Sequence, residues 1–244
     1  MRTEIEISAQ EDLANAFADR LERLAAEAIA VRGRFSLALT GGSAAAALLP
    51  RLVSARVDWN LADLFWGDER AVPSADPESN YALAERLLLG PAAVPAANRH
   101  RLPADLPDLD LAASAAEREL IDCLGEPPRL DLIWLGLGDD GHVASLFPGS
   151  PLLDEKQRYV AAVRESPKPP AARLTLTLPA IAAARAVVVT ALGATKAAAV
   201  GSALRDPGSR SPLALALAAA ENSWLLLDPA AARDLPSLAR PPGR

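Results

Sequence analysis

The sequence predicts an α/β fold of the Rossmann-like type, with three layers (α/β/α) built around a mainly parallel sheet. Three observations lead to this prediction: strand-like and helix-like segments alternate, the apolar runs of the strand-like segments lack in/out alternation, and several of these segments end in glycines or charged residues. Alternation indicates βαβ units with parallel strands, and uninterrupted apolar runs are typical of strands covered on both faces. We expect a single domain over residues 1–244, with a frayed proline-rich tail at 235–244.

The first half of the chain shows this alternation most clearly. Apolar spacing and punctuation predict strands at 3–8, 34–42 and 61–70, and helices at 9–32, 43–54 and 76–90. Ser43 can cap the second of these helices, and Gly90 ends the third. Residues 91–110 contain four prolines and show no periodicity, which predicts a surface loop.

The second half continues the pattern with less punctuation. A helix is predicted at 111–125 and a buried strand at 129–138. The remaining strand-like or helix-like segments are 173–179, 185–193, 195–205, 213–220 and 222–228. No internal repeat and no long linker interrupts them.

Composition excludes several classes of partner and compartment. Half of the residues are hydrophobic, 23% are charged, and the net charge of −6 argues against nucleic acid or an anionic membrane as partner. Cys123 is the only cysteine, so we expect no disulfide framework and no cysteine-based zinc site. The first residues lack the apolar core of a signal peptide, and no run of about 18 uncharged apolar residues predicts a membrane span. A cytoplasmic protein is expected.

Three predicted strands end in unusual polar sequences: TGGS at 40–43, GDER at 67–70 and GLGDDGH at 136–142. Each alone is weak, because a glycine pair or a charged group after a strand is often only a turn. In a parallel sheet, however, ligands bind beyond the carboxyl ends of the strands. The three sequences together predict a pocket at this rim, where Arg173, Thr175 and Lys196 could join them.

The TGGS sequence favours an anion. Gly41 and Gly42 allow close backbone approach, and Ser43 at a helix start leaves amide donors facing a phosphate. The segment is neither a Walker loop, because the GKS or GKT ending is missing, nor a dinucleotide fingerprint. The basic candidates to neutralise a phosphate monoester, which carries roughly two charges, are Arg70, Arg173 and Lys196. The structural alternative for each is a surface salt bridge.

His142 with Asp140 indicates a general base oriented by a carboxylate. A serine nucleophile is disfavoured because Ser43 does not lie in a G-x-S-x-G elbow. One histidine with adjacent aspartates and no nearby cysteine is a thin ligand set, so no metal is expected. Water activated by His142 is the simplest remaining chemistry, whereas the other histidine, His100, lies in the proline-rich loop.

Four segments resemble the 6-phosphogluconolactonases: LALTGGSAAAALLPRL, FWGDERAVPSADPESNYALAERLLL, DLIWLGLGDDGHVASLFPGSP and RLTLTLPAIAAARAVVVTALGATKAAAV. The resemblance implies a fold shared with the glucosamine-6-phosphate deaminases and isomerases. It implies hydrolysis of 6-phospho-D-glucono-1,5-lactone to 6-phosphogluconate, the second step of the oxidative pentose phosphate pathway, without a cofactor. Carried over by residue, it places His142 as the base with Asp68 and Asp140 in support. The phosphate and ring would be surrounded by Gly41, Gly42, Ser43, Arg70, Arg173 and Lys196.

Two departures bear on the alternatives. Ala44 and Ala45 stand where the family often has Thr-Pro, so one hydroxyl contact is lost. Phe147 stands where the deaminase relatives carry a glutamate, which disfavours amino-sugar phosphate deamination because that reaction needs a further proton carrier. A non-catalytic sugar-phosphate sensor is the third interpretation, and the His142–Asp140 pair argues against it. The expected partner is the lactone alone, bound by a monomer.

Overall fold

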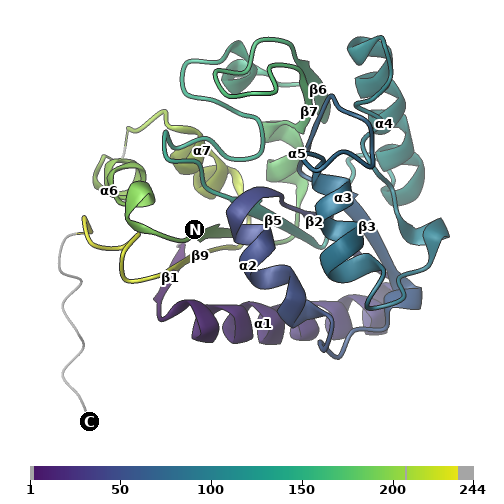
Figure 1. Cartoon of the computed structure of the whole chain (residues 1–244), viewed down its shortest axis with the longest axis horizontal. Coiled ribbons are helices and arrows are strands. Elements are labelled where there is room, and N and C mark those ends of the chain that lie inside the picture. Colours follow the sequence, from purple (N-terminus) through teal and green to yellow (C-terminus); the bar gives the residue numbers. More distant parts are fainter. Residues whose placement is uncertain (1–2, 207, 236–244) are drawn as a thin grey trace.

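The main sheet consists of parallel strands (Figure 1), as predicted. The computed structural model describes residues 3–206 and 208–235, so the predicted frayed tail lies, apart from Leu235, outside the described residues. Within this part, the sheet has six strands in the order β1-β9-β8-β5-β2-β3. They are β1 (Glu4–Ile7), β2 (Phe35–Leu39), β3 (Ala62–Trp66), β5 (Leu132–Gly136), β8 (Val187–Ala191) and β9 (Ser223–Leu227).

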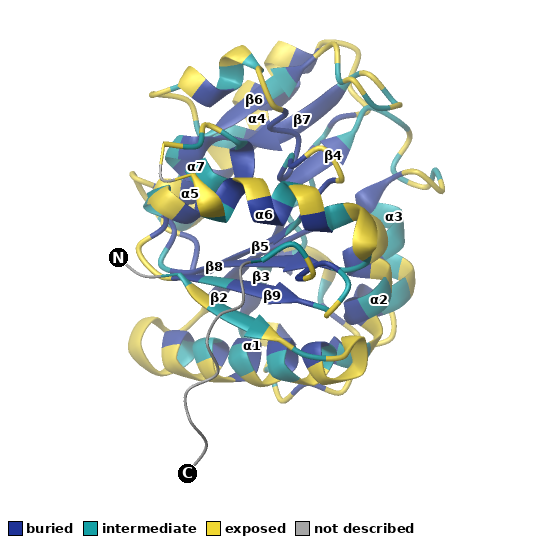
Figure 2. Ribbon diagram, turned by 90° about the vertical axis from the view of Figure 1, so that its left-hand side faces the viewer, coloured by how far each residue is buried: buried dark blue, intermediate teal, exposed yellow. Residues whose placement is uncertain are grey.

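Helices cover both faces of this sheet, which gives the predicted three layers. Helix α1 lies on one face, and α5, α6 and α7 lie on the other (Figure 2). The helices are α1 (Gln10–Arg32), α2 (Gly42–Leu52), α3 (Asn80–Ala84), α4 (Leu109–Leu124), α5 (Leu178–Ala183), α6 (Ala197–Arg205) and α7 (Pro212–Ala219). Among the described residues, none of the helices is both long and apolar enough to cross a membrane.

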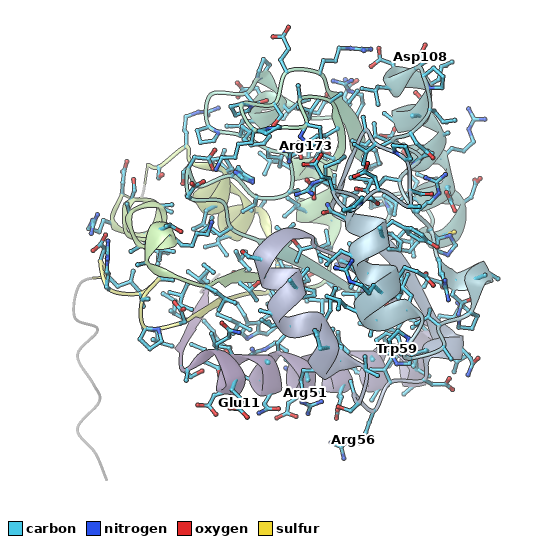
Figure 3. All side chains as sticks on the ribbon, in the orientation of Figure 1. Glu11, Arg51, Arg56, Trp59, Asp108 and Arg173 are labelled. Carbon is cyan, nitrogen blue, oxygen red and sulfur yellow. The ribbon has the colours of Figure 1, made fainter. Side chains whose placement is uncertain are left out.

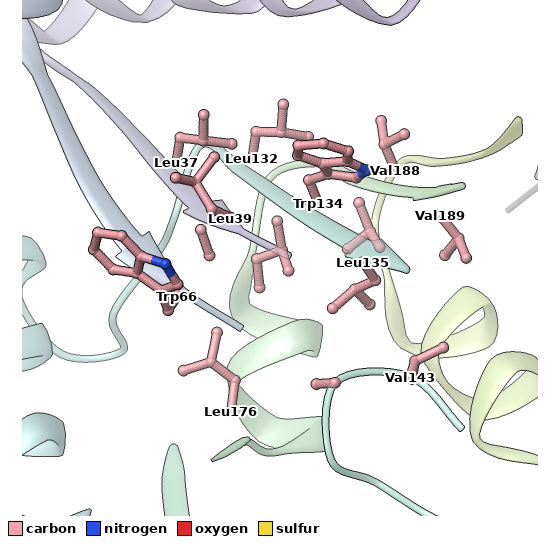
Figure 4. Close-up of a cluster of buried hydrophobic side chains, with 14 of the residues drawn as sticks. Leu37, Leu39, Trp66, Leu132, Trp134, Leu135, Val143, Leu176, Val188 and Val189 are labelled. Carbon is pink, nitrogen blue, oxygen red and sulfur yellow. The ribbon is translucent and has the colours of Figure 1, made fainter. Parts of the chain in front are cut away.

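The core fills the space between the sheet and these helices. Strands β2 and β8 are buried along their whole length, which explains their lack of polar alternation. Figure 4 shows Leu37, Trp134, Val188 and their neighbours packed together. Trp134 packs against Phe17 of α1, with ring centroids 4.5 Å apart, and its indole N–H donates to the Thr190 hydroxyl at 2.9 Å. The core therefore holds the central strands rigidly beneath the loops at their carboxyl ends.

A second, smaller sheet was not predicted. It is antiparallel, in the order β4-β7-β6, with β4 (Asp68–Arg70), β6 (Val160–Val163) and β7 (Arg173–Leu176). The single strand predicted over 61–70 is divided at Gly67, so β3 belongs to the main sheet and β4 to the small one. The Gly67 amide donates to Leu39 at 2.8 Å, and its carbonyl accepts from Leu176 at 2.7 Å. One residue thus connects the two sheets.

Two further segments differ from their predicted form. The helix expected over 76–90 begins only at Asn80, because the Ser79 hydroxyl caps it by accepting from Ala82 N, and residues 85–89 form a π-helical turn. The loop expected over 91–110 ends where α4 begins at Leu109, contains a 3-10 turn at Ala96–Asn98, and is anchored where His100 N donates to Leu64 O at 2.8 Å. Its His100 is therefore fixed against the sheet.

Candidate active site

A pocket lies at the carboxyl ends of the central parallel strands. Its walls come from the loops after β2 and β5, from β4 and β7 of the small sheet, and from the segments that carry Lys168 and Lys196. All predicted site residues except Asp140 and Thr175 line it, and Asp140 is hydrogen-bonded to His142. The lining residues are Thr40, Gly41, Gly42, Ser43, Ala44, Asp68, Arg70, Gly136, Leu137, Gly138, Asp139, His142, Ala144, Lys168, Arg173 and Lys196.

The TGGS loop is shaped by contacts with two neighbouring elements. The Thr40 hydroxyl accepts from Gly136 N at 2.9 Å, which ties the ends of β2 and β5 together. A side chain at Gly41 would collide with Asn80, whose Oδ1 lies 1.8 Å from the ideal Cβ position, and Gly42 has a left-handed φ of +69°. No described side chain caps α2. The first amides of α2 are therefore available to an anion in the pocket.

His142 and Asp140 form the predicted pair. His142 Nδ1 lies 2.5 Å from Asp140 Oδ1, which also accepts from the His142 amide at 3.2 Å. Burial opposes ionisation of Asp140, but the hydrogen bonds from His142 outweigh it and lower the Asp140 pKa. An ionised carboxylate only accepts hydrogen bonds, so the neutral imidazole carries its proton on Nδ1. The Nε2 lone pair is then available to take a proton.

Two glycines create the turn that holds this pair. Gly138 N donates to His142 O at 2.8 Å, and Gly141, with a φ of +88°, bonds back to Gly138 O. A Cβ at Gly138 would lie 2.1 Å from His142 Nδ1 and 2.6 Å from Asp140 Oδ1. The glycine spacing of GLGDDGH is therefore the local reason that the imidazole folds back over the strand end.

Burial lowers the pKa of His142 below its ordinary value, although the bond to Asp140 and the charge of Asp68 act in the opposite direction. Phe147 contributes to this apolar cover, since its ring centroid lies 4.5 Å from that of the imidazole. The imidazole is consequently neutral near pH 7, as a general base must be.

Asp68 is the buried centre of a hydrogen-bond network. Its Oδ2 accepts from the Ser145 hydroxyl at 2.6 Å, and its Oδ1 accepts from Asn80 Nδ2 at 3.1 Å. The neighbouring Glu69 accepts from the first amides of α3, at Asn80 and Tyr81. Our sequence analysis did not assign Ser145 and Asn80, although D-x-x-S-N and the ASLF segment after the histidine were the available signals. The network joins β4 to α3 and to the loop after β5.

The three predicted cations differ in how many of their donors are already used. Arg70 Nη1 donates to Glu78 O at 2.6 Å, while its buried Nε has no hydrogen-bond partner among the described residues. Burial lowers the pKa of the Lys196 ammonium, which lies at the end of a 3-10 turn before α6. Arg70 and Lys196 therefore keep donors for an anion.

Arg173 is nearly fully buried and is the first residue of β7 (Figure 3). Its Nε donates to Pro170 O at 3.0 Å, and its Nη2 donates to Lys168 O at 3.0 Å and to Pro169 O at 3.1 Å. Its Nη1 lies 3.9 Å from Asp68 Oδ2. The Nε and Nη2 groups of Arg173 are therefore already hydrogen-bonded to the backbone carbonyls of residues 168–170.

Our sequence analysis gave no role to two charged residues of the pocket, Asp139 and Lys168, and it placed Thr175 wrongly at the rim. Lys168 forms an ion pair with Asp139, and its Nζ lies 4.0 Å from Asp140 Oδ2. The signal for Lys168 was a lone basic residue within PKPP, just before the strand of Arg173. Thr175, expected at the rim, is instead fully buried, and its hydroxyl accepts from Ser145 N at 3.1 Å. Within residues 3–206 and 208–235, no three potential metal ligands come together.

Fold and site together define a Rossmann-like α/β protein whose pocket is lined, among the described residues, by the first residues of α2, by four cationic side chains and by a histidine paired with an aspartate. The family model of glucosamine-6-phosphate isomerases/6-phosphogluconolactonase matches residues 8–225. The chain belongs to this family.

Relatives of known name and structure cover almost the whole chain. It is 42% identical to a 6-phosphogluconolactonase of Streptomyces coelicolor, over 96% of this chain and 94% of the relative. It is also 42% identical to that of Mycobacterium tuberculosis, over 97% and 100%. A solved 6-phosphogluconolactonase from Trypanosoma brucei superposes with a TM-score of 0.85 at 30% identity, over 96% and 99%. A monomeric glucosamine-6-phosphate deaminase has a TM-score of 0.81 at 20% identity, over 95% and 100%, which is a likeness of fold alone.

Proposed function

We propose that this chain hydrolyses 6-phospho-D-glucono-1,5-lactone to 6-phospho-D-gluconate, in the oxidative pentose phosphate pathway, with water activated by His142. The observation that carries the mechanism is the 2.5 Å contact between His142 Nδ1 and Asp140 Oδ1 beside the TGGS loop. It presents a neutral imidazole, with an available Nε2, next to amides and cations suited to a phosphate. The 6-phosphogluconolactonase names of the full-length relatives support the substrate class.

In the proposed mechanism, the phosphate is bound first. The α2 amides at Gly42 and Ser43 and the side chains of Arg70 and Lys196 contact it, and Arg173 supports them from below. This binding places the lactone carbonyl near His142. Asp68 takes a supporting role through its network, since both of its carboxylate oxygens accept hydrogen bonds from protein groups.

Neutral His142 then removes a proton from water as the water oxygen attacks C1 of the lactone. Backbone N–H groups of the pocket loops stabilise the oxyanion, other than those of Gly138 and Gly141, which already donate within their own turn. The C1–O bond to the ring oxygen breaks, and the protonated His142 returns its proton to that oxygen. The product is the open-chain acid, and the imidazole is again neutral. Asp140 accepts the Nδ1–H hydrogen bond of His142 throughout, and its negative charge stabilises the imidazolium that forms transiently.

Amino-sugar phosphate deamination is the main alternative, and Phe147 argues against it. Its ring lies against both His142 and Arg173, with 5.5 Å from the Arg173 Cζ to the ring centroid. An apolar ring at this place supplies no second proton carrier, which ring opening and amine release require. A sugar-phosphate sensor is disfavoured because binding alone needs no oriented base.

The setting we propose is a monomer in the cytoplasm that needs no cofactor or metal, with the lactone as its partner and no nucleic acid. Hydrolysis by one base and one water needs no further group, because a δ-lactone is already reactive.

The test compares two assays on the purified protein. One follows acid release from freshly generated 6-phosphogluconolactone, corrected for spontaneous hydrolysis, and the other follows ammonia release from glucosamine 6-phosphate. We expect activity only in the first. Ammonia release without lactone hydrolysis would replace the proposed function by the deaminase alternative, and binding without turnover in either assay would favour the sensor.

A further inference from the structure

Lys168 is a cation of the pocket that the proposed mechanism leaves without a role. Its ammonium is paired with Asp139 and lies 4.0 Å from the Asp140 carboxylate, so it sits beside the His142–Asp140 pair. Both Lys168 and Asp139 line the pocket, and their side chains are 35% and 53% exposed. The pair is therefore at the solvent-exposed rim, within the same cavity as Lys196.

The backbone of Lys168 is fixed, in contrast to its side chain. Its carbonyl accepts from Arg173 Nη2 at 3.0 Å and from the Ser166 hydroxyl at 2.8 Å, and its amide donates to the Ser166 hydroxyl at 3.2 Å. Ser166 N in turn donates to Ala171 O at 2.8 Å. We call residues 166–171 the PKPP segment. The buried guanidinium of Arg173 thus holds this segment over the pocket, while the four-carbon stem of Lys168 remains able to reorient.

We propose that Lys168 is a substrate-binding residue whose ammonium exchanges its partner, from Asp139 in the empty pocket to the phosphate of the bound ligand. This inference rests on the proposed function for the identity of the ligand, a sugar phosphate. Asp139 acts as the counter-ion that keeps Lys168 at the rim until the phosphate arrives.

Charge and exposure make this exchange favourable. A solvent-exposed ion pair is weak, because both groups remain well hydrated and the pair costs side-chain freedom. A phosphate dianion offers Lys168 two charges and three acceptor oxygens, in a pocket where Arg70 and the α2 amides already collect negative charge. Of the described residues that line this pocket, four are cationic and two are acidic. Moving Lys168 onto the phosphate leaves Asp139 facing solvent, where an unpaired carboxylate is well tolerated.

The exchange assigns Arg173 a positioning role. Its Nε and Nη2 already bind the PKPP segment, and only its Nη1 side faces Asp68 and the pocket. Selectivity for phosphorylated over unphosphorylated lactones then comes from Lys168 together with Arg70 and Lys196, with Arg173 holding the first of these in place.

The test measures binding of 6-phosphogluconate and of gluconate by titration calorimetry to the wild type, Lys168→Met, Asp139→Asn and the double variant. We expect Lys168→Met to weaken 6-phosphogluconate binding about 10- to 100-fold, the effect of one lost charge-assisted contact, with little change for gluconate. Asp139→Asn should tighten 6-phosphogluconate binding severalfold, because the competing carboxylate is gone. In the Lys168→Met background, Asp139→Asn should have no such effect. Lys156→Met, at an exposed lysine outside the pocket, is the matched control.

Two outcomes would overturn the exchange: unchanged 6-phosphogluconate binding in Lys168→Met, or equal weakening in both single variants. The second outcome would mean that the Lys168–Asp139 pair only supports the loop. The binding assay does not depend on turnover. If the wild type hydrolyses the lactone but the four proteins do not show the expected binding changes, only this inference is wrong. If the binding changes appear but the wild type does not hydrolyse the lactone, the proposed reaction is wrong and the phosphate contact stands.

Discussion

The two histidines of this chain occupy comparable settings, but their pKa values are shifted in opposite directions. His142 contacts one carboxylate, Asp140, whereas His100 lies between two, with Glu119 at 2.9 Å and Asp63 at 3.3 Å. Both rings pack against a phenylalanine: His142 on Phe147 and His100 on Phe65. The hydrogen bond with Asp63, helped by Glu119, raises the pKa of His100 despite burial, while burial lowers the pKa of His142 despite Asp140.

The difference shows that a carboxylate beside a histidine does not by itself make a base. The raised pKa of His100 favours its cationic form, which pairs with Asp63 and Glu119 and suits a structural link between loop and sheet. His142 is held neutral at the pocket, which suits proton removal. The balance between burial and the number of acidic partners decides which of these results.

Among the substitutions that test this contrast between the two histidines, His142→Asn should have the largest effect on activity. Asparagine keeps some hydrogen bonding but accepts no proton near neutral pH, so kcat should fall roughly 10²–10⁴-fold. KM and thermal stability should stay close to the wild type. His100→Asn is the internal control and should keep wild-type kcat. Full activity in His142→Asn would rule out the base assignment, and unfolding of that variant would favour a purely structural histidine.

Gly138→Ala should have the next largest effect, because it disturbs the pair without changing either partner. The added Cβ meets His142 Nδ1 at 2.1 Å, so the imidazole must move. Displacement by about an ångström lowers kcat by roughly 10²-fold. Gly149→Ala is a suitable comparison, since its Cβ meets nothing within 4 Å although its φ of +76° adds backbone strain. Steady-state kinetics with equal losses in both variants would contradict the role of Gly138.

Lys196→Ala tests the phosphate contacts and should act mainly on KM. Loss of one charge-assisted contact of about 1.5–3 kcal/mol corresponds to a rise in KM of roughly 10- to 150-fold. Unphosphorylated gluconolactone should scarcely respond. Arg173→Ala should also raise KM, and we expect it to lower thermal stability as well, because three carbonyls of the PKPP segment each lose a hydrogen bond from Arg173. If Lys196→Ala impaired both substrates equally, the lysine would only support the fold.

The smallest effects concern pH. The acid limb of wild-type kcat/KM should have its midpoint below the ordinary histidine value of 6.5, because the His142 pKa is lowered. Protonated His100 adds to the free energy of unfolding at pH values below its pKa in the unfolded state. This stabilisation is lost as the pH rises through the raised pKa of His100 in the folded state. The His142 contribution is present above its unfolded pKa and is lost as pH falls through its lowered folded pKa.

Urea unfolding of the wild type, His100→Asn and His142→Asn across pH 5 to 9 measures both contributions. Each should be within ~1 kcal/mol. If the free energy of unfolding differed from that of the wild type with the same pH dependence in both variants, the contrast between the two histidines would be contradicted.

The parts of the site that could be predicted are those set by short-range sequence. The TGGS loop and the GLGDDGH turn follow directly from apolar strands, and their glycines permit the left-handed backbone conformations that these turns contain. The uncapped first amides of α2 and the His142–Asp140 pair, two residues apart, were therefore accessible from sequence. The parallel sheet could be predicted for the same reason, since each βα unit is formed by a short continuous stretch of sequence.

The parts that could not be predicted depend on long-range pairing. Strands β4 and β6 have only three and four residues, and Arg70 pairs with Arg173 across the small sheet. Apolar patterns that short carry little signal, and nothing local indicates an antiparallel partner a hundred residues away. The Lys168–Asp139 pair and the burial of Thr175 follow from this sheet, so they were missed with it.

The connection through Gly67 has a consequence for protein engineering. Arg70 and Arg173 belong to the small sheet, while the TGGS loop and His142 follow strands of the main sheet, and Gly67 joins the two through one amide and one carbonyl. His142, the proposed general base, therefore lies on a different substructure from Arg70 and Arg173, which would bind the phosphate or position its contacts. Libraries confined to β4, β6, β7 and the PKPP segment can change ligand preference while the strand ends that orient the imidazole stay intact.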